Sequence, residues 1–424
     1  MLRRHLLRFA PLLVLSGVAR GQSAVAPAFL GASDAAPSPA DVLGVAAEPY
    51  FRDWLNGFYA RALLEGVPQR VLTEALSGLS PDPRVLARDG RQPEFARPVS
   101  DYVRGSVTAS RIAEGRLRRR EVPQFDQIER NWGCPRDVLL AIWAMESGYG
   151  ASQGDMDVVR SLATLAASGR RRDWAESELT AALRIMASGR TGGRRLLGSW
   201  AGAMGQTQML PSVYLSEGVD ADGDGRVDIW TSAADALGSA AKLLSTAGWR
   251  RGESWARQVR LEPGFDLSLS EGPRLTPDEW AGRGAIRHGG DPWSEADAAA
   301  SAQLLLPCGA QGPAFLAFPN HFVIRSYNNA LAYALAVGLL ADGFGGGDPL
   351  AIAWPHETPL SLDDRLASQT ALASLGFDPG PLDGLIGARA RAALRAWQKS
   401  QGIPADGYLS AAMVARLRAG SRKS

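Results

Sequence analysis

One glutamate, Glu146, is the residue of this 424-residue chain whose type and setting best suit proton transfer. Helical spacing places Leu139, Ile142 and Trp143 on the face that also carries this glutamate. A carboxyl group on such an apolar stripe loses its hydration, which favours the protonated form and raises its pKa. Gly148 is placed to end the helix, so the carboxyl lies in the last turn and can reach a cleft. A carboxyl that stays neutral near pH 7 is the general acid that glycoside cleavage needs. The competing interpretation is a structural glutamate paired with a buried arginine.

A second candidate segment, residues 199–214, combines glycines with side-chain amides. Gly202 and Gly205 lack side chains that would keep a ligand away from the backbone. Gln206 and Gln208 each offer a donor and an acceptor, which suits the hydroxyl and acetamido groups of sugars. The sequence therefore predicts a sugar-contacting loop, and the simpler alternative is a tight turn between two helices.

An acidic loop at residues 220–235 has the start of an EF-hand pattern. Its carboxylates stand at loop positions 1, 3, 5 and 9: Asp220, Asp222, Asp224 and Asp228. Gly225 at position 6 permits the sharp bend that lets alternating carboxylates converge on one hard cation. Position 12 is Thr231 instead of glutamate, but Asp235 lies four residues further on and can close the site. We expect a structural calcium ion here, and the alternative is a solvated acidic turn.

Other catalytic chemistries lack their characteristic residues. The histidines beyond the first 24 residues are far apart and form no HExxH zinc motif: His288, His321 and His356. The sequence has no GxSxG elbow, no P-loop and no GxGxxG that opens a helix. Serine-hydrolase, phosphoryl-transfer and hydride-transfer chemistry therefore lose most of their support. With 46% hydrophobic residues and 12 tryptophans, most of the chain can bury a core, which excludes wholesale disorder.

The first residues have the composition of an export signal. Arg3 and Arg4 precede an apolar stretch that is followed by small residues. We therefore expect a signal peptide at 1–24, of the general or the twin-arginine type, and a flexible leader at 25–47. Loss of the four arginines in the signal changes the net charge from +2 to −2, which argues against nucleic-acid binding. No later apolar run is long enough to span a bilayer, so we expect a soluble periplasmic protein.

Helical patterns dominate from residue 48 onward. Residues 48–342 form the main unit, with short strand-like pieces at 258–261 and 321–324. Residues 343–359 are rich in glycine and proline, which is typical of a linker. Residues 360–424 alternate three helical patterns with two Asp-Gly loops and are long enough to fold alone. The two cysteines, Cys134 and Cys308, form either a disulfide or two buried thiols.

Taken together, these segments resemble the membrane-bound lytic transglycosylase B family of peptidoglycan-cleaving enzymes. The segments that carry the resemblance are 141–150, 162–165 with Arg170 and Arg171, 199–214, the acidic loop through Asp235, Gly248 with Trp249, and 324–337. They span residues 50–342 and are jointly specific. The tail, with segments 375–384 and 396–398, resembles the small three-helix peptidoglycan-binding module of cell-wall enzymes.

The resemblance implies a mainly α fold, with a lysozyme-like catalytic domain of minor β content and a small three-helix C-terminal module. It implies that Glu146 is the single catalytic acid and base. The family's substrate-contacting positions are those of Arg170, Arg171, Ser199, Gln208, Tyr327, Asn328 and Tyr333. Its calcium loop falls on Asp220, Asp222, Asp224, the main chain of Arg226, and Asp235. The chemistry requires no cofactor, and the expected partners are peptidoglycan glycan strands.

The expected reaction cleaves the β-1,4 bond between N-acetylmuramic acid and N-acetylglucosamine and leaves a 1,6-anhydro end. Glu146 gives its proton to the leaving oxygen and then takes the proton of the muramic C6 hydroxyl, which attacks C1. No second carboxylate lies near the motif in sequence, so the substrate's 2-acetamido oxygen is the expected stabiliser of the oxocarbenium charge. The alternatives are a hydrolytic muramidase on the same scaffold, a non-catalytic wall-binding protein and a calcium-regulated interaction protein.

Overall fold

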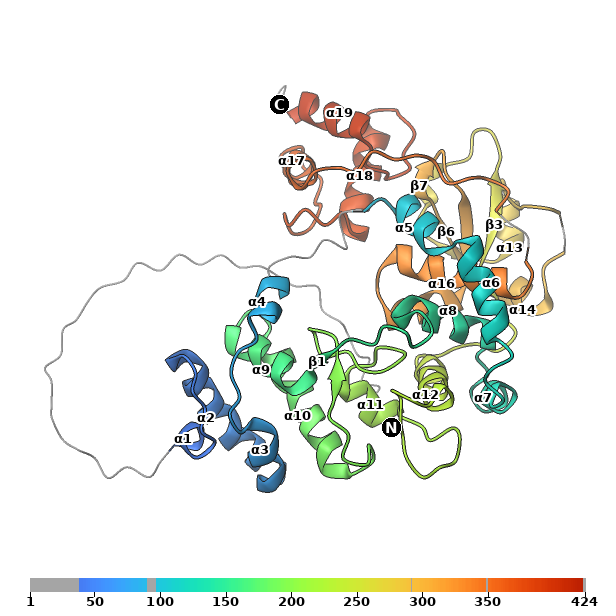
Figure 1. Ribbon diagram of the computed structural model, residues 1–424. Coiled ribbons are helices and arrows are strands. Elements are labelled where there is room, and N and C mark those ends of the chain that lie inside the picture. Colours follow the sequence, from blue (N-terminus) through green and yellow to red (C-terminus); the bar gives the residue numbers. More distant parts are fainter. Residues whose placement is uncertain (1–37, 90–96, 291, 348–349, 422–424) are drawn as a thin grey trace, which may run out of the picture.

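The computed structural model describes residues 38–89, 97–290, 292–347 and 350–421, and it is mainly α-helical (Figure 1). The predicted signal peptide, 1–24, and the predicted leader up to residue 37 lie outside the described residues. Within the described part, no helix is both long and apolar enough to cross a bilayer.

The helices are α1 Pro39–Val42, α2 Pro49–Leu64, α3 Gln69–Leu76, α4 Pro83–Asp89, α5 Val99–Ser106, α6 Ala109–Arg118, α7 Phe125–Trp132, α8 Arg136–Ser147, α9 Val158–Ser168, α10 Arg172–Ser188, α11 Pro211–Glu217, α12 Ala233–Thr246, α13 Pro277–Ala281, α14 Glu295–Ala299, α15 Pro319–Tyr327, α16 Leu331–Phe344, α17 Leu362–Ser374, α18 Ala388–Ser400 and α19 Ala411–Ser421. The strands are β1 Met156–Asp157, β2 Leu197–Gly198, β3 Ala256–Leu261, β4 Arg274–Leu275, β5 Ala285–Arg287, β6 Ala302–Leu305, β7 Pro307–Ala310 and β8 Ala314–Ala317.

Helix α8 carries the candidate acid and lies in the main core. It begins after Pro135 and ends at Gly148, whose φ of 57° gives the left-handed C-cap that glycine adopts without strain. Every residue from 138 to 144 is buried, as the apolar run predicts. The sequence-based expectation of a helix that ends at Gly148, with Glu146 in its last turn, is confirmed.

Helix α16 packs against α8 in the antiparallel direction. The hydroxyl of Tyr333, near the start of α16, donates a hydrogen bond to Glu146 at the end of α8. Gly345, just beyond the other end of α16, lies beside the carboxylate of Asp137 in the first turn of α8. The candidate acid is therefore at one end of this helix pair, and Asp137 is at the other.

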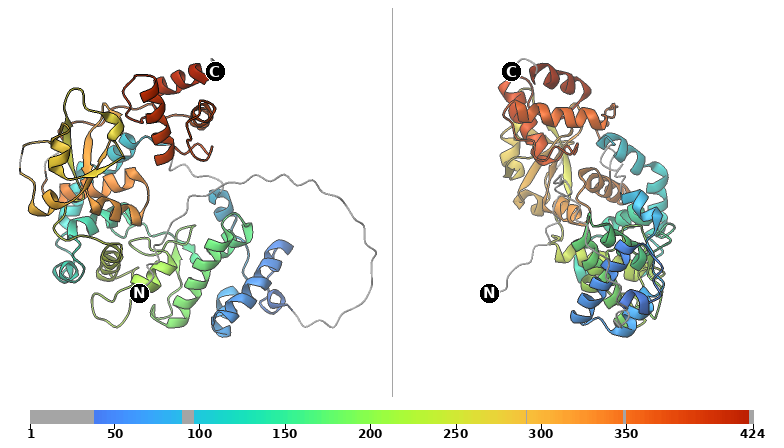
Figure 2. Two further views of the ribbon diagram at one scale, coloured as in Figure 1. Left: turned by 180° about the vertical axis from the view of Figure 1, so that it is seen from behind. Right: turned by 90° about the vertical axis from the view of Figure 1, so that its left-hand side faces the viewer.

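The first helices form one end of the molecule. Helices α2, α3 and α4 pack against α9 and α10, and Figures 1 and 2 show this group away from the sheet. Residues 38–47, which fall in the predicted flexible leader, belong instead to the folded part. A capping box on Ser38 starts α1, and Ala40, Leu43 and Val45 are buried. These apolar side chains are what ties the end of the leader to α2.

A five-stranded sheet in the order β4-β6-β8-β3-β5 follows, and every neighbouring pair is antiparallel. Its own core includes Trp280 and Leu316. The predicted strand at 258–261 lies in β3, which confirms it. The strand-like piece at 321–324 was a wrong prediction, because these residues lie in α15. Pro319 at the first helical turn favours a helix start there, and this outweighs the β propensity of the apolar run.

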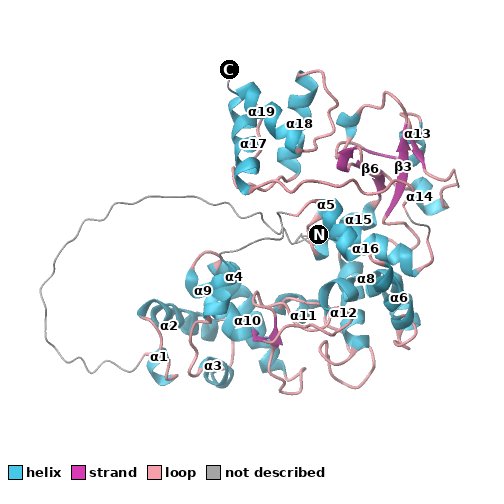
Figure 3. Cartoon of the chain, turned by 45° about the horizontal axis from the view of Figure 1, so that its top comes forward, coloured by secondary structure: helices cyan, strands magenta, loops and turns pink. Residues whose placement is uncertain are grey.

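The C-terminal residues form three helices, α17 to α19, around a small core that includes Leu372, Trp397 and Leu417. Figure 3 shows this group beside the part of the chain that carries the sheet. Glu271, before β4, accepts hydrogen bonds from Arg391 at 2.6 Å and Arg395 at 2.9 Å, both in α18. The module is therefore docked through a charged cluster in which all three side chains are largely buried.

The predicted linker, 343–359, is attached to the main unit over its described second half. Residues 350–359 form no helix or strand, but Trp354 stacks on Phe315 with ring centroids 6.1 Å apart. The carboxylate of Glu357 accepts the backbone N–H of Ser100 at 3.1 Å. This part of the linker is thus packed against α5 and β8.

Candidate active site

Glu146 lies where the surrounding protein removes most of its hydration, although part of the residue still reaches the surface. Burial raises the pKa of its carboxyl to about 7, and this outweighs the hydrogen bond from Tyr333, which favours the ionised form. The Tyr333 hydroxyl donates to Oε1 of Glu146 at 2.6 Å and is itself buried. Near neutral pH the site therefore presents a carboxyl that is oriented by a phenol and that a ligand can reach.

The turn after α8 is fixed by Ser147, a residue that the sequence did not single out. Its hydroxyl donates to the carbonyl of Gln206 at 2.6 Å and accepts the N–H of Gly150 at 2.8 Å. The side-chain oxygen of Gln206 accepts the indole N–H of Trp143 at 2.9 Å. Gln206 is 5% exposed, so its amide supports the site and does not face a ligand. A serine next to a candidate catalytic glutamate at a helix end is the only sequence signal for this network.

The loop that begins at Ser199 lies beside the turn that follows α8. The Ser199 hydroxyl accepts the N–H of Ala203 at 3.0 Å, so it organises the loop. Gln208 has a positive φ of 50°, and its side-chain nitrogen donates to the carbonyls of Gln153 and Gly205, each at 2.9 Å. Its side-chain oxygen has no donor among the described residues and remains available to a ligand.

Tyr327 connects this loop to α15. Its hydroxyl donates to the carbonyl of Thr207, and the charge of Glu146 contributes to raising its pKa, after burial. Tyr327 and Tyr333 therefore both lie close to the candidate acid. Asn328, the C-cap of α15, is exposed, and its side-chain oxygen accepts the N–H of Ala330.

Arg170 and Arg171 are held together by Asp89 at the end of α4. Arg170 donates from Nε at 2.9 Å and Arg171 from Nη2 at 2.8 Å. Burial alone raises the pKa of Asp89, but the two guanidinium groups outweigh it and leave that pKa lowered. The guanidinium of Arg171 also lies 4.9 Å from the ring of Trp174 and 5.4 Å from that of Trp200. Since Trp200 follows Ser199, this contact joins the arginine pair to the loop.

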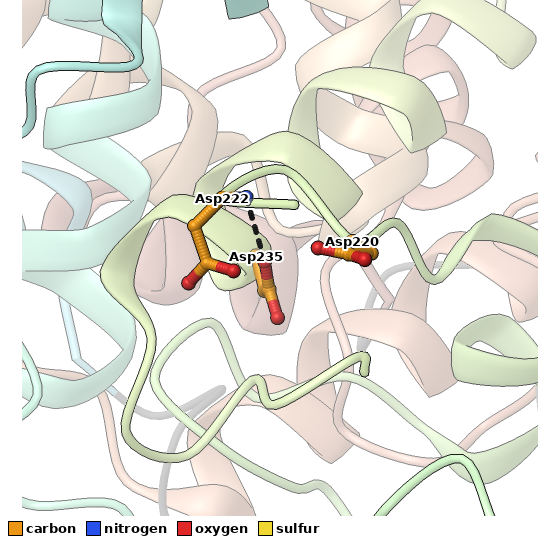
Figure 4. Close-up of side chains that lie close together, drawn as sticks. All are labelled: Asp220, Asp222 and Asp235. Atoms are coloured by element: carbon orange, nitrogen blue, oxygen red, sulfur yellow. Dashed lines mark hydrogen bonds between the residues drawn. The ribbon is translucent and has the colours of Figure 1, made fainter. Parts of the chain in front are cut away.

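Three carboxylates of the acidic loop converge, as Figure 4 shows. One oxygen from each of Asp220, Asp222 and Asp235 lies within 4.8 Å of the others. Asp235, in the first turn of α12, is fully buried and accepts the backbone N–H of Ala221 at 2.8 Å. Burial raises the pKa of Asp235, and the nearby charge of Asp222 adds to this effect. Oxygen ligands in this arrangement suit a hard cation such as calcium.

The two other carboxylates of the predicted loop lie outside this cluster. The carboxylate of Asp224 accepts the N–H of Arg226 at 2.8 Å. Asp228 pairs with Arg194 at 3.0 Å and accepts the N–H of Thr231. The structure therefore brings together three of the predicted ligand residues and uses Asp224 to shape the turn.

Cys134 and Cys308 are both free and buried. Cys134 precedes α8, and Cys308 lies in β7, where its sulfur is 3.4 Å from an oxygen of Glu357. The sequence leaves open either a disulfide or two buried thiols, and the structure has two buried thiols.

Comparison with known families gives two matches that together cover most of the chain. The transglycosylase SLT domain family matches residues 50–342. The chain belongs to this family. The peptidoglycan-binding domain family matches residues 361–417.

The individual proteins and structures that this transglycosylase domain protein resembles agree with the family assignment. It is 28% identical over 230 residues to membrane-bound lytic murein transglycosylase B of Escherichia coli strain K12, a match that covers 51% of this chain and 60% of that protein. The structure of SltB3 from Pseudomonas aeruginosa in complex with NAG-anhNAM-pentapeptide superposes with a TM-score of 0.83 at 44% identity, and covers 88% of this chain and all of the other. Soluble lytic transglycosylase SltB1 from the same organism gives a TM-score of 0.61 at 25% identity, over 69% of this chain and 98% of the other.

Proposed function

We propose that this protein is a lytic transglycosylase that cleaves the MurNAc-β-1,4-GlcNAc bond of peptidoglycan and leaves 1,6-anhydro-MurNAc ends. The observation that carries the proposal is the carboxyl of Glu146, whose pKa burial raises to about 7 and which Tyr333 orients. A group with a pKa near the working pH can both give and take a proton in one catalytic cycle.

The reaction begins with the protonated carboxyl of Glu146, which donates its proton to the departing GlcNAc oxygen. The carboxylate that results accepts a hydrogen bond from Tyr333, so the phenol stabilises the charged form as it appears. This carboxylate then removes the proton from the muramic C6 hydroxyl, which attacks C1 and closes the anhydro ring. The nucleophile belongs to the same sugar, so no water has to be positioned.

The substrate's own 2-acetamido oxygen is proposed to stabilise the oxocarbenium charge that develops at C1. Among the described residues, no second carboxylate contributes to the shifted pKa of Glu146, whereas paired catalytic carboxylates interact strongly. Gln208, with its free side-chain oxygen, and Asn328, which is exposed, are the polar groups proposed to contact sugar. SltB3, which is 44% identical to this chain and whose structure is a complex with NAG-anhNAM-pentapeptide, supports the same product class.

The decisive test is to digest purified sacculi with the full chain and weigh the released fragments. Anhydro ends, which lack one water relative to hydrolysed ends, are the expected product, and Glu146→Gln is expected to release none. Glu74→Gln is the matched control, since it removes a carboxylate from the exposed face of α3. Hydrated reducing ends would identify a muramidase, and binding to sacculi without release would identify a wall-binding protein.

The acidic loop is proposed to hold a structural calcium ion. Asp220, Asp222 and Asp235 would supply carboxylate oxygens, and the ion would relieve the repulsion between these converging charges. No catalytic step involves this loop, because the proton transfers take place at Glu146.

The place of action is proposed to be the periplasm. This rests on the predicted export signal at residues 1–24 and on the match of 361–417 to a peptidoglycan-binding family. We expect the C-terminal module to keep the enzyme on the wall while the main unit cleaves.

A further inference from the structure

The C-terminal module has a first Asp-Gly loop, residues 383–385, that the fold holds in one conformation. The side-chain oxygen of Gln369, in α17, accepts the N–H of Gly384 at 2.7 Å. The amide nitrogen of the same glutamine donates to Oδ1 of Asp383 at 3.3 Å, and the N–H of Leu385 donates to this oxygen at 2.8 Å. Oδ2 of Asp383 has no donor among the described residues and reaches the surface. The loop therefore presents one preformed acceptor to solvent.

A second Asp-Gly loop, residues 406–408, repeats this arrangement. The side-chain oxygen of Gln398, in α18, accepts the N–H of Gly407 at 2.8 Å, and its amide nitrogen donates to Oδ1 of Asp406 at 2.9 Å. The N–H of Tyr408 donates to the same oxygen at 3.0 Å. The glycines of the first and second loops have similar positive φ angles, 76° and 71°. The two loops are therefore equivalent sites on the module.

The second loop already holds a peptide backbone, which belongs to the main unit. Oδ2 of Asp406 accepts the N–H of Ala310, at the end of β7, at 3.1 Å. Gly309, which precedes this N–H, has a φ of 66°. The Cβ of an L-residue at that position would lie 2.5 Å from Oδ2 of Asp406 and 2.8 Å from Cβ of Tyr408. Both the contact and the left-handed backbone exclude an L side chain there.

The occupant of the second loop defines what an equivalent site can bind. It is an amide N–H that follows a residue with positive φ and no L side chain. Besides glycine, a D-amino acid meets this description, because D-residues favour positive φ as the mirror images of L-residues. The Cβ of a D-residue also takes the other hydrogen position of the glycine. D-Alanine in the stem peptides of peptidoglycan is such a residue.

Exposed apolar side chains surround the free oxygen of the first loop. Leu382 and Leu385 are both exposed. Leu362 is exposed as well, and it lies against Gly384, where a Cβ would touch its side chain. In the second loop the residue at the place of Leu385 is Tyr408, which is covered by β7. The methyl groups of alanine residues can cover the exposed leucines, and burial of this apolar area favours binding.

We propose that the first Asp-Gly loop is the wall-binding site of the module, and that it binds stem peptide through Oδ2 of Asp383 and an amide N–H that follows D-alanine. The inference rests on the proposed function in taking peptidoglycan as the polymer that the module holds, and it names the part of the polymer that is held. The module then binds the peptide while Glu146 acts on the glycan, so the two units do not compete for the same part of the wall.

The test is saturation-transfer NMR of the full chain with N-acetyl-D-alanyl-D-alanine amide. The mirror-image peptide of L-alanine is the matched ligand control and should bind about tenfold more weakly. Asp383→Asn replaces Oδ2 by a donor and keeps Oδ1 for Gln369 and Leu385. It should weaken binding of the D-peptide about tenfold, as loss of a hydrogen bond to a charged group predicts. Asp363→Asn, which removes an exposed carboxylate from the first turn of α17, should leave binding unchanged.

Three results would overturn the proposal. The first is equal binding, or no binding, of the two peptides to the unmodified chain. The second is binding of the D-peptide that Asp383→Asn leaves unchanged while its melting temperature matches that of the parent. The third is binding of the tetrasaccharide of N-acetylglucosamine that depends on Asp383, with no binding of either peptide, which would assign the loop to glycan.

Failure of the proposed function would be seen in a different experiment. The peptide titrations involve no cleavage, so they report on the first Asp-Gly loop alone. Intact sacculi after digestion with the unmodified chain, together with stereospecific binding of the D-peptide, would refute the lytic activity and leave the peptide site in place.

Discussion

Replacing Glu146 by glutamine should stabilise the protein at neutral and alkaline pH, because the fold disfavours the ionised carboxyl. The pKa is about 7 in the folded state against an ordinary value of 4.5. Between these values the folded protein binds more protons than the unfolded chain, so stability falls as pH rises. The difference of 2.5 pKa units corresponds to about 3 kcal/mol at 1.36 kcal/mol per unit. Glutamine keeps an oxygen for Tyr333 and carries no charge.

The assay is thermal unfolding of the unmodified chain and Glu146→Gln from pH 4 to pH 8. The two melting temperatures should agree near pH 4, and the variant should melt about 6 °C higher at pH 8, at about 2 °C per kcal/mol for a domain of this size. The control Glu74→Gln, on the exposed face of α3, should show no such trend. A constant difference between parent and Glu146→Gln across this range would refute the reasoning, because it would mean that the carboxyl ionises equally well in the folded and unfolded chain.

Three other outcomes follow from the site and the module. Tyr333→Phe removes the hydrogen bond that favours the ionised carboxyl, so the alkaline limb of the pH profile of kcat/KM should move up by about one pH unit, and an unmoved limb would contradict this. Chelation of calcium should lower the melting temperature more than the rate of cleavage; an unchanged melting curve would count against an ion at Asp220, Asp222 and Asp235. Truncation after residue 359 keeps the packed part of the linker, so it should weaken retention on sacculi and spare the cleavage of soluble glycan fragments. Equal loss of retention and cleavage would show that the module is part of the active unit.

Local signals in the sequence were sufficient to place the candidate acid. The apolar period of α8 and the glycine after it predict both the burial of Glu146 and its position in the last turn. The same reasoning failed at 321–324, where a short apolar run fits a strand or a buried helix equally well.

Long-range contacts are what the sequence could not supply. Tyr333 is predicted to contact substrate, which stays a prediction; the structure adds its hydrogen bond to Glu146, which is 187 positions away in sequence. Arg170 and Arg171 were expected at the substrate, and the structure pairs them with Asp89, which has no motif of its own. The docking of the module through Glu271 likewise could not be predicted, because nothing in the sequence distinguishes this buried glutamate from an exposed one.

The most direct measurement of the central claim is a carbon-13 NMR titration of the glutamate carboxyl groups in the full chain, with Glu146→Gln to assign the signal. The claim predicts one carboxyl that is lost in this variant and that titrates with a midpoint near pH 7. A midpoint near the ordinary value of 4.5 would contradict it, because such a group is fully ionised at neutral pH and has no proton to give.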